Sequence, residues 1–318
     1  MEDYPHTLED LETRFSSDEE CRDYLLGLRW PEGFICPRCQ GRKSWPIAAV
    51  RYECAACGYQ VSVTAGTIFQ DTHKPLTTWF RAMWWVTSQK NGASALGLKR
   101  ILGLGSYQTA WTWLHKLRRA MVRPGRDRLS GRVEVDETYI GAPEEGADGR
   151  WTEAKSLVVI AAQEDGPGIG RIRMRRVPDA SGPSLLGFIQ DAVQPGSIVH
   201  TDGWESYKGL PGLGYEHVTT KLKGQVALAS TMLPRVHRVA SLLKRWLLGT
   251  HQGAVSKQHL EYYLDEFTFR FNRRTSRHRG KLFYRLLQQA VQVDPQPYQG
   301  MIRHVRPGPR KPPRVGLT

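Results

Sequence analysis

Four of the five cysteines in this 318-residue chain fall into two C-x-x-C pairs, a spacing typical of a metal-binding ribbon. Cys36 pairs with Cys39, Cys54 pairs with Cys57, and 14 residues separate the two pairs. Thiolates held in this way can complete a tetrahedral zinc site with Zn–S bonds of about 2.3 Å. Four-cysteine zinc sites are generally structural, so we expect zinc to stabilise a ribbon rather than take part in a reaction.

Two aspartates form a second group of residues that could do chemistry. Asp136 lies in the middle of an alternating stretch at 132–140, and Asp202 follows a short apolar stretch at 198–201. A carboxylate in such a place is costly unless it serves a cation. Carboxylates that converge on two divalent ions support in-line phosphoryl displacement. Either aspartate alone has a plainer explanation, since an Asp before a Gly, as at Asp202, is often a turn residue.

The segments around the two aspartates predict an α/β domain. Alternating or apolar runs predict strands at 132–140, 155–165, 170–181 and 198–201, and helical spacing predicts a helix at 182–196. Three strands, a helix and a further strand tipped by an acid are the element order of a ribonuclease-H-like fold. Such a fold would bring the two aspartates together on neighbouring strands.

Three segments with helical spacing of apolar residues lie between the cysteines and this domain, at 75–92, 93–106 and 107–123. A short helix, a glycine-bearing turn and a second helix with a basic end resemble a helix-turn-helix, whose second helix would enter the major groove. The alternative is a small helical bundle, because tryptophans at helical spacing usually pack in a core.

The ends of these three helices can also be predicted. Thr77 or Thr78 could cap the first helix, and Ser106 could cap the third. The basic residues near the end of the third helix are the candidate DNA contacts of this region: Lys116, Arg118 and Arg119.

The overall charge favours double-stranded DNA as the partner. Lys and Arg number 45 against 31 Asp and Glu, which gives a net charge of +14 and an isoelectric point near 9.7. The apolar runs stay short of the ~18 residues that a membrane span needs, and the first residues are too acidic for a signal peptide. We therefore expect a cytoplasmic, nucleoid-associated protein without a membrane partner.

These patterns divide the chain into five expected segments. They are an N-terminal helical segment (1–30), a zinc ribbon (31–70), a helix-turn-helix-like DNA-binding domain (71–125), a ribonuclease-H-like domain (126–290) and a basic flexible tail (291–318).

In combination, the motifs resemble the insertion-sequence transposases that join an N-terminal zinc ribbon to a DDE-type catalytic domain. The resemblance covers roughly residues 15 to 290 and rests on the ribbon followed by "VEVDETYIG", "VHTDGWESY", "LLKRWLLGTHQG" and "YYLDEFTFRFNRR". It implies that Asp136 and Asp202 bind metal, and that a homodimer or higher multimer cuts at transposon inverted repeats and transfers strands. It also implies a third ligand, usually Glu and sometimes Asn, on the next helix, followed by a Lys that contacts DNA.

The chain departs from this family pattern at the third ligand. Between His217 and Leu260 the sequence contains no Asp or Glu. The separation of 35 residues that is commonest in the superfamily leads from Asp202 to His237, and Lys244 follows seven residues later. Residues two turns apart share a helix face. Imidazole can bind a divalent ion, so His237 is a possible third ligand with Lys244 as the DNA-facing residue.

A histidine there has consequences for the metal and leaves alternatives open. A neutral imidazole contributes no negative charge, so we hypothesise a weaker Mg²⁺ site and a preference shifted toward Mn²⁺. Alternatively, His237 contacts a DNA phosphate beside Arg235 and Arg238, or this copy has decayed and is inactive. A non-catalytic DNA-binding protein is a further reading of the whole chain.

A last amphipathic helix is expected at 257–272. Its Glu266 could swing into a metal site, but a solvent-facing or salt-bridged acid beside the neighbouring arginines is the plainer interpretation. The remaining candidate DNA contacts are basic residues that would follow phosphates without reading sequence: Arg245, Arg270, Arg273 and Arg274.

Overall fold

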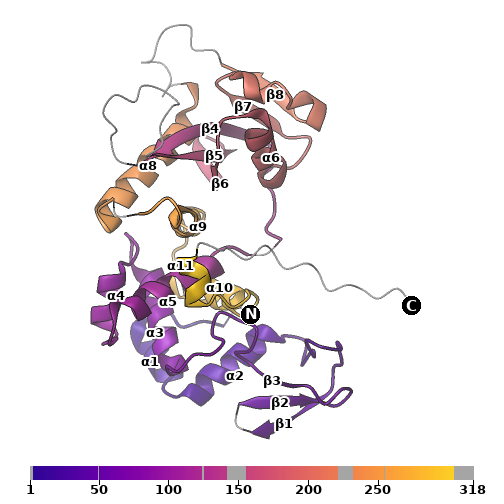
Figure 1. Cartoon of the computed structure of the whole chain (residues 1–318), viewed down its shortest axis with the longest axis vertical. Helices are drawn as coiled ribbons and strands as arrows, with labels where there is room; N and C mark the ends of the chain where they lie inside the picture. Colours follow the sequence, from indigo (N-terminus) through magenta and orange to yellow (C-terminus); the bar gives the residue numbers. More distant parts are fainter. Residues whose placement is uncertain are drawn as a thin grey trace. The chain divides into compact units, whose positions relative to one another are not determined.

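The structure is a computed structural model, and it describes most of the chain. The described residues are 3–48, 50–123, 125–141, 155–220, 232–253 and 255–303. The chain divides into two compact units, which are Met1–Gly125 with Ser276–Thr318, and Arg126–Thr275 (Figure 1). The three N-terminal segments expected from the sequence thus lie in one unit.

The last part of the expected catalytic domain also groups with the first unit. Helix α10 (Arg279–Ala290) inserts Phe283 among aromatic residues of α3 (Leu76–Ser88), where its ring lies 5.6 Å from Phe80 and 5.8 Å from Trp84. Phe283 is fully buried. This packing is why the structural boundary falls near residue 275, whereas the sequence placed it at 290.

The first unit begins with two short helices that carry complete capping boxes. In α1 (Leu8–Arg14) the N-cap is Thr7, and in α2 (Asp18–Arg29) it is Ser17. In both helices the N-cap hydroxyl accepts a hydrogen bond from the N–H of the third helical residue, and the acidic side chain of that residue accepts one from the N-cap N–H.

The ribbon is a three-stranded antiparallel sheet of β1 (Ser44–Ala48), β2 (Arg51–Cys54) and β3 (Gln60–Ser62). Strands β2 and β3 fall in the alternating stretch at 51–63 around the second cysteine pair. Strand β1 was not predicted. It is an edge strand that contains Pro46, and such a residue weakens a strand pattern.

The helices after the ribbon are α3, α4 (Ala95–Ile101) and α5 (Tyr107–Ala120). The predicted cap at Ser106 is confirmed, since its hydroxyl accepts a hydrogen bond from the Thr109 N–H at 3.0 Å. The predicted threonine cap of the first helix is wrong, because α3 begins one residue after Pro75, which is its N-cap. Proline presets the backbone angle at that position, and Thr77 and Thr78 lie inside the first turn.

Aromatic side chains build the core beneath these helices. The rings of Trp79 on α3 and Trp113 on α5 are stacked with centroids 3.8 Å apart, and Phe69 meets Trp79 edge-on. The expected basic tail starts with a short helix, α11 (Tyr298–Ile302), whose Met301 is fully buried. Residues 304–318 of that expected tail lie outside the described residues.

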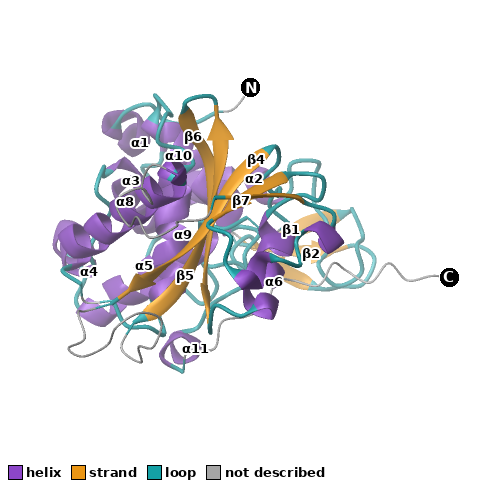
Figure 2. Ribbon diagram, turned by 90° about the horizontal axis from the view of Figure 1, so that it is seen from above, coloured by secondary structure: helices purple, strands orange, loops and turns teal. Residues whose placement is uncertain are grey.

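The second unit contains a five-stranded mixed sheet in the order β6-β5-β4-β7-β8. Strands β4 (Arg132–Ile140), β5 (Ser156–Asp165) and β6 (Gly168–Val177) form an antiparallel meander. After α6 (Gly182–Ala192), the short strand β7 (Ile198–Thr201) pairs parallel with β4, and β8 (Glu216–Thr219) pairs parallel with β7. This topology is ribonuclease-H-like, as the sequence predicted, with β4 in the centre of the sheet (Figure 2).

Each face of this sheet has its own apolar core. On one face, Val133 and Val135 of β4 pack with α6 residues such as Phe188. On the other face, β5 residues such as Ile160 pack with α8 (Pro234–His251) and α9 (Leu260–Phe271). Because side chains alternate along a strand, β4 can send apolar groups to the α6 face and polar groups toward α8.

Four elements of the second unit differ from expectation. Strand β8 was not predicted, and α9 begins at Leu260 rather than near 257. Strand β6 ends at Val177 rather than near 181, and α6 ends at Ala192 rather than near 196. Among the helices of the described residues, none has the length and apolar character to cross a membrane.

Candidate functional site

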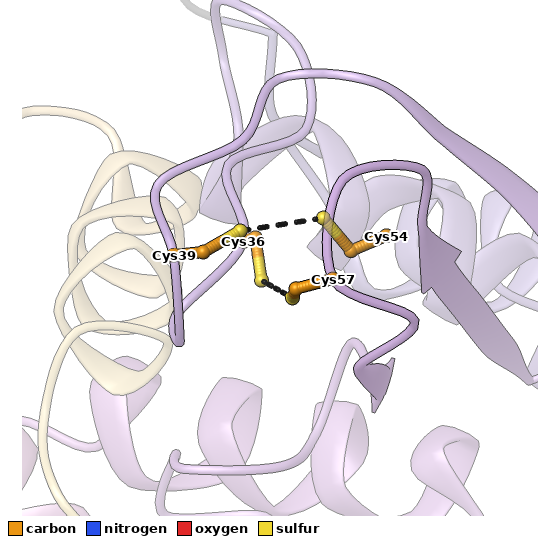
Figure 3. A group of neighbouring side chains, drawn as sticks. All are labelled: Cys36, Cys39, Cys54 and Cys57. Carbon is orange, nitrogen blue, oxygen red and sulfur yellow. Dashed lines mark hydrogen bonds between the residues drawn. The ribbon is translucent and has the colours of Figure 1, made fainter.

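The two cysteine pairs converge on one point (Figure 3). The sulfur atoms of Cys36 and Cys57 are 3.7 Å apart, those of Cys39 and Cys54 are 3.6 Å apart, and all four lie within 4.8 Å of one another. A tetrahedral ion with Zn–S bonds of about 2.3 Å would hold its sulfurs about 3.8 Å apart. The cluster therefore fits structural zinc.

Local backbone turns hold each cysteine pair in place. The Gln40 N–H donates to the Cys36 carbonyl at 3.0 Å, and the Gly58 N–H donates to the Cys54 carbonyl at 2.9 Å. Gly58 has φ of +66°, which suits glycine. Gly41 is needed for space, because a Cβ there would lie 3.1 Å from the Cys54 Sγ.

Asp136 and Asp202 come from neighbouring parallel strands. The last paired residues of β4 and β7 are Glu134 and His200, and each aspartate follows two residues later. This register sets Asp136, inside β4, level with Asp202, which lies just beyond the end of β7. Asp202 is also a turn residue, since its Oδ1 accepts a hydrogen bond from the Trp204 N–H at 2.9 Å.

His237 lies in the first turns of α8, beside Asp136. Its Nε2 is 3.8 Å from the Asp136 Oδ2, and the two side chains are 34% and 18% exposed. Burial lowers the pKa of His237, and the negative charges of Glu134 and Asp202 only partly oppose that shift. The imidazole is therefore neutral near pH 7, so one ring nitrogen keeps a lone pair for a metal ion.

The contact between Asp136 and His237 is compatible with a shared ion. Metal–ligand bonds of about 2.1 Å allow two ligand atoms of one ion to lie at most about 4.2 Å apart. Their separation of 3.8 Å is within that limit. Asp202 does not complete a closed ligand set with them, since within the described part of the chain only the four cysteines form a group of three or more converging ligands.

Three residues near these ligands were missed by the sequence reading. Glu134, on β4 two residues before Asp136, accepts hydrogen bonds from the backbone N–H groups of Arg235 and Val236 at 2.7 and 2.9 Å. The alternation of β4 was a usable signal, because it places Glu134 on the same face as Asp136.

The other two missed residues connect the loop after Asp202 to β4. The Tyr207 hydroxyl, in the 3₁₀ turn η1 (Glu205–Tyr207), donates to the Glu137 Oε2 at 2.8 Å. Burial raises the pKa of Tyr207, and the charges of Glu137, Asp136 and Asp202 raise it further. The neutral hydroxyl donates a hydrogen bond to Glu137 and so ties this loop to β4.

The basic residues near the end of α5 are buried or half-buried. Arg118 is only 2% exposed, and Arg119 is half-buried. Lys116 lies 6.0 Å from the centre of the Trp79 ring, and burial lowers its pKa. Arg118 is thus held inside the first unit, whereas the exposed residues of α5 lie at its start, at Tyr107 and Gln108.

The basic residues of α8 divide into two kinds. Arg238, Lys244 and Arg245 are exposed, and Lys244 lies on the same helix as His237, close enough for its charge to lower the pKa of that histidine. Arg235 is different, because its guanidinium bonds to Glu134 at 2.9 Å and to two backbone carbonyls. A phosphate contact by Arg235 is thus not favoured by its geometry.

The arginines near the end of α9 lie against the protein. Arg270 pairs with Glu266 at 2.8 Å, and Glu266 is fully buried, so this acid is salt-bridged but not solvent-facing. The guanidinium groups of Arg273 and Arg274 lie over the rings of Phe269 and Phe271, at 4.0 and 4.1 Å from their centres.

Comparison with known proteins finds a matching transposase domain in each of the two units. Residues 128–272 match the ISXO2-like transposase domain, and residues 16–60 match the transposase zinc-ribbon domain. An uncharacterized protein in transposable element ISH50 of Halobacterium salinarum is 28% identical over 277 residues, which are 80% of this chain and 91% of that protein. An uncharacterized transposase-like protein of Haemophilus influenzae is 30% identical over 96 residues, which are 30% of this chain and 76% of that protein.

Among solved structures, a pre-cleavage Mos1 transpososome aligns at 12% identity and a TM-score of 0.28, over 74% of this chain and 80% of that chain. The two domain matches follow the order of the ribbon and the ribonuclease-H-like sheet along the chain. One relative is a protein in a transposable element, and the other is a transposase-like protein. The chain belongs to the ISXO2-like family of DDE transposases and carries a transposase zinc ribbon in front of its ribonuclease-H-like domain.

Proposed function

We propose that this chain is a polynucleotidyl transferase that binds the terminal inverted repeats of a transposable element and cleaves and transfers DNA strands there. The contact of 3.8 Å between the Asp136 carboxylate and the His237 imidazole carries the proposal. It joins β4 to α8, and the register of β4 and β7 sets Asp202 level with Asp136.

In this proposal Asp136, Asp202 and His237 hold divalent metal. Bound Mg²⁺ or Mn²⁺ would activate the attacking oxygen and stabilise the leaving oxygen of the phosphodiester. The two carboxylates supply the negative charge of the site, and the neutral imidazole supplies a nitrogen. Nitrogen ligands suit Mn²⁺ better than Mg²⁺, so we expect faster cleavage with Mn²⁺.

The exposed basic residues of α8 would hold the DNA against the proposed metal site. Lys244, two turns after His237, would contact the phosphate beside the scissile bond, with Arg238 and Arg245 on neighbouring phosphates. The first unit would hold the inverted repeat through α4 and α5, with zinc as the structural ion of the ribbon. Two or more copies of the chain would act together on the paired ends of the element.

The test uses a duplex that carries one end of the element. The wild-type chain should nick it in Mn²⁺ and more slowly in Mg²⁺, and Asp136→Asn or Asp202→Asn should remove the product without weakening DNA binding in metal-free buffer. Binding without nicking in either metal would instead indicate a non-catalytic DNA-binding protein.

The role of His237 has its own variants. His237→Ala should weaken nicking, and unchanged nicking would remove His237 from the site. If His237→Glu creates nicking that the wild-type chain lacks, the natural sequence is a decayed copy.

A further inference from the structure

The first turn of α8 is capped from outside the helix. Its N-cap is Leu233, which has no polar side chain, and Pro234 at the first position has no N–H. The next two N–H groups, of Arg235 and Val236, both donate to one carboxylate oxygen of Glu134. A side chain of strand β4 thus satisfies the start of this helix, and its negative charge faces the positive end of the helix dipole.

The side chain of Arg235 strengthens the same anchor. Its Nη1 donates to Glu134 at 2.9 Å and to Glu164 at 3.2 Å. Its Nε and Nη2 donate to the carbonyls of Gly168 and Gly166, each at 2.9 Å. Arg235 is 18% exposed and Glu134 only 1% exposed, so this ion pair is shielded from solvent. The helix start is thereby fixed to β4, to the end of β5 and to the β5–β6 turn.

This anchor lies next to Asp136 and His237, the two proposed ligands that are in contact. Glu134 and Asp136 share one face of β4, and His237 follows Arg235 by two residues on α8. Apolar contacts such as that of Val239 hold α8 on the sheet, but they are non-directional and tolerate sliding and rotation. Hydrogen bonds to a fixed carboxylate are directional, so they set where α8 begins and which way it faces.

We propose that Glu134 is a positioning residue: it fixes the first turn of α8 so that His237 lies beside Asp136, and Arg235 serves this anchor rather than a DNA phosphate. The inference rests on the proposed function only in that Asp136 and His237 hold the metal. Residues that orient metal ligands typically change metal affinity by roughly 10- to 100-fold when they are replaced.

The experiment compares Glu134→Gln with Asp191→Asn in the full chain. Asp191 is a matched control, since it is also paired with an arginine, Arg175, at 2.9 Å, but on an exposed surface. We expect Glu134→Gln to speed hydrogen exchange at the Arg235 and Val236 amides without metal, and to weaken Mn²⁺ binding about tenfold in a titration. The control should do neither, and Glu134→Gln behaving like the control would overturn the proposal.

A double variant separates positioning from charge balance. Glu134→Gln leaves the buried Arg235 guanidinium without one carboxylate, which alone destabilises a protein. Glu134→Gln with Arg235→Met removes that burden, so thermal stability should recover while Mn²⁺ binding stays weak. Recovery of Mn²⁺ affinity to the wild-type value would show that Glu134 only balances charge.

The role of Arg235 is tested by the salt dependence of DNA binding. Arg238→Met should reduce the slope of log affinity against log salt by about one, as expected for a lost phosphate contact. Arg235→Met should leave the slope unchanged, and an equal reduction would contradict its place in the anchor. If Asp136→Asn leaves Mn²⁺ binding unchanged, the proposed function fails, whereas the exchange measurement still decides the anchor.

Discussion

The zinc ribbon and the acidic site, which consists of Asp136, Asp202 and His237, are both candidate metal sites, but the chain builds them in different ways. In the ribbon, Cys36 and Cys57 are 21 residues apart, and all four ligands sit on two backbone turns. At the acidic site, Asp136, Asp202 and His237 come from a strand, a loop and a helix. The sulfur atoms of the ribbon ligands all lie close together, whereas at the acidic site the close approach is between Asp136 and His237.

The difference shows that a site built from distant residues needs separate anchors. The cysteine pairs are placed by hydrogen bonds within a few residues of each ligand. The segments that carry Asp202 and His237 are instead tied to β4 by Glu137, which bonds to Tyr207, and by Glu134, which bonds to the start of α8. Replacing a distant anchor should therefore harm the acidic site, whereas the ribbon depends on its ligands and on the turns beside them.

Replacing Cys54 with Ser should have the largest effect. Structural zinc contributes an apparent binding free energy of about 10–16 kcal/mol, so loss of one thiolate should release the ion and unfold the ribbon. Zinc content by mass spectrometry should fall to background, while the amides of β4 and β5 keep their protection from hydrogen exchange. Cys21→Ala is the control, since Cys21 is buried outside the cluster and should leave zinc content intact.

Chelation should separate the two sites next. Four thiolates bind zinc far more tightly than two carboxylates and an imidazole bind Mg²⁺ or Mn²⁺. Brief treatment with EDTA should therefore abolish strand cleavage without removing zinc, and added Mn²⁺ should restore cleavage. Cleavage that survives EDTA, or zinc that leaves together with activity, would contradict the assignment of two independent sites.

The anchor at Tyr207 should have a moderate effect. Tyr207→Phe removes a buried hydrogen bond to the charged Glu137, which should cost about 1.5–3 kcal/mol of stability and should also slow strand cleavage. Tyr215→Phe is a matched control, because its hydroxyl donates to the Val193 carbonyl at 3.0 Å in the core. It should lower thermal stability by about 0.5–1.5 kcal/mol without a specific loss of cleavage. Equal loss of cleavage in both variants would make Tyr207 merely structural.

The smallest effects are expected at single basic residues. Lys244→Ala should reduce the salt slope of DNA binding by about one, since Lys244 is exposed on α8. Arg118→Met should lower stability but leave the slope unchanged, because Arg118 is buried in the first unit. The measurement is binding to a labelled duplex over a series of salt concentrations, and a slope change in Arg118→Met would show that α5 rearranges on DNA.

Much of the fold could be read from local patterns. The strands that carry or precede the aspartates, Arg132–Ile140 and Ile198–Thr201, have the bounds that alternation and apolar runs predicted. The polar strand Glu216–Thr219 was not predicted, because it is short and lies at the sheet edge. Helix α3 was given a cap at a threonine, since propensity does not reveal that Pro75 already starts the helix.

The candidate DNA contacts were harder to predict than the candidate ligands. Lys and Arg can lie at the surface or bury their long stems, and sequence alone does not distinguish these states. Arg118 is buried and Arg235 is half-buried in an ion pair, whereas Arg238 and Lys244 are exposed. Burial depends on which elements pack against each residue, and that information is not local.

The sequence by itself determined the cysteine cluster, the strands with their aspartates, and the absence of an acid between His217 and Leu260. These features follow from spacing and periodicity over a few residues, where chain geometry leaves little choice. Only the tertiary structure decided that His237 lies beside Asp136 and that Glu134 bonds to the first turn of α8. The reason is physical, because the position of α8 depends on directional bonds between residues about one hundred positions apart.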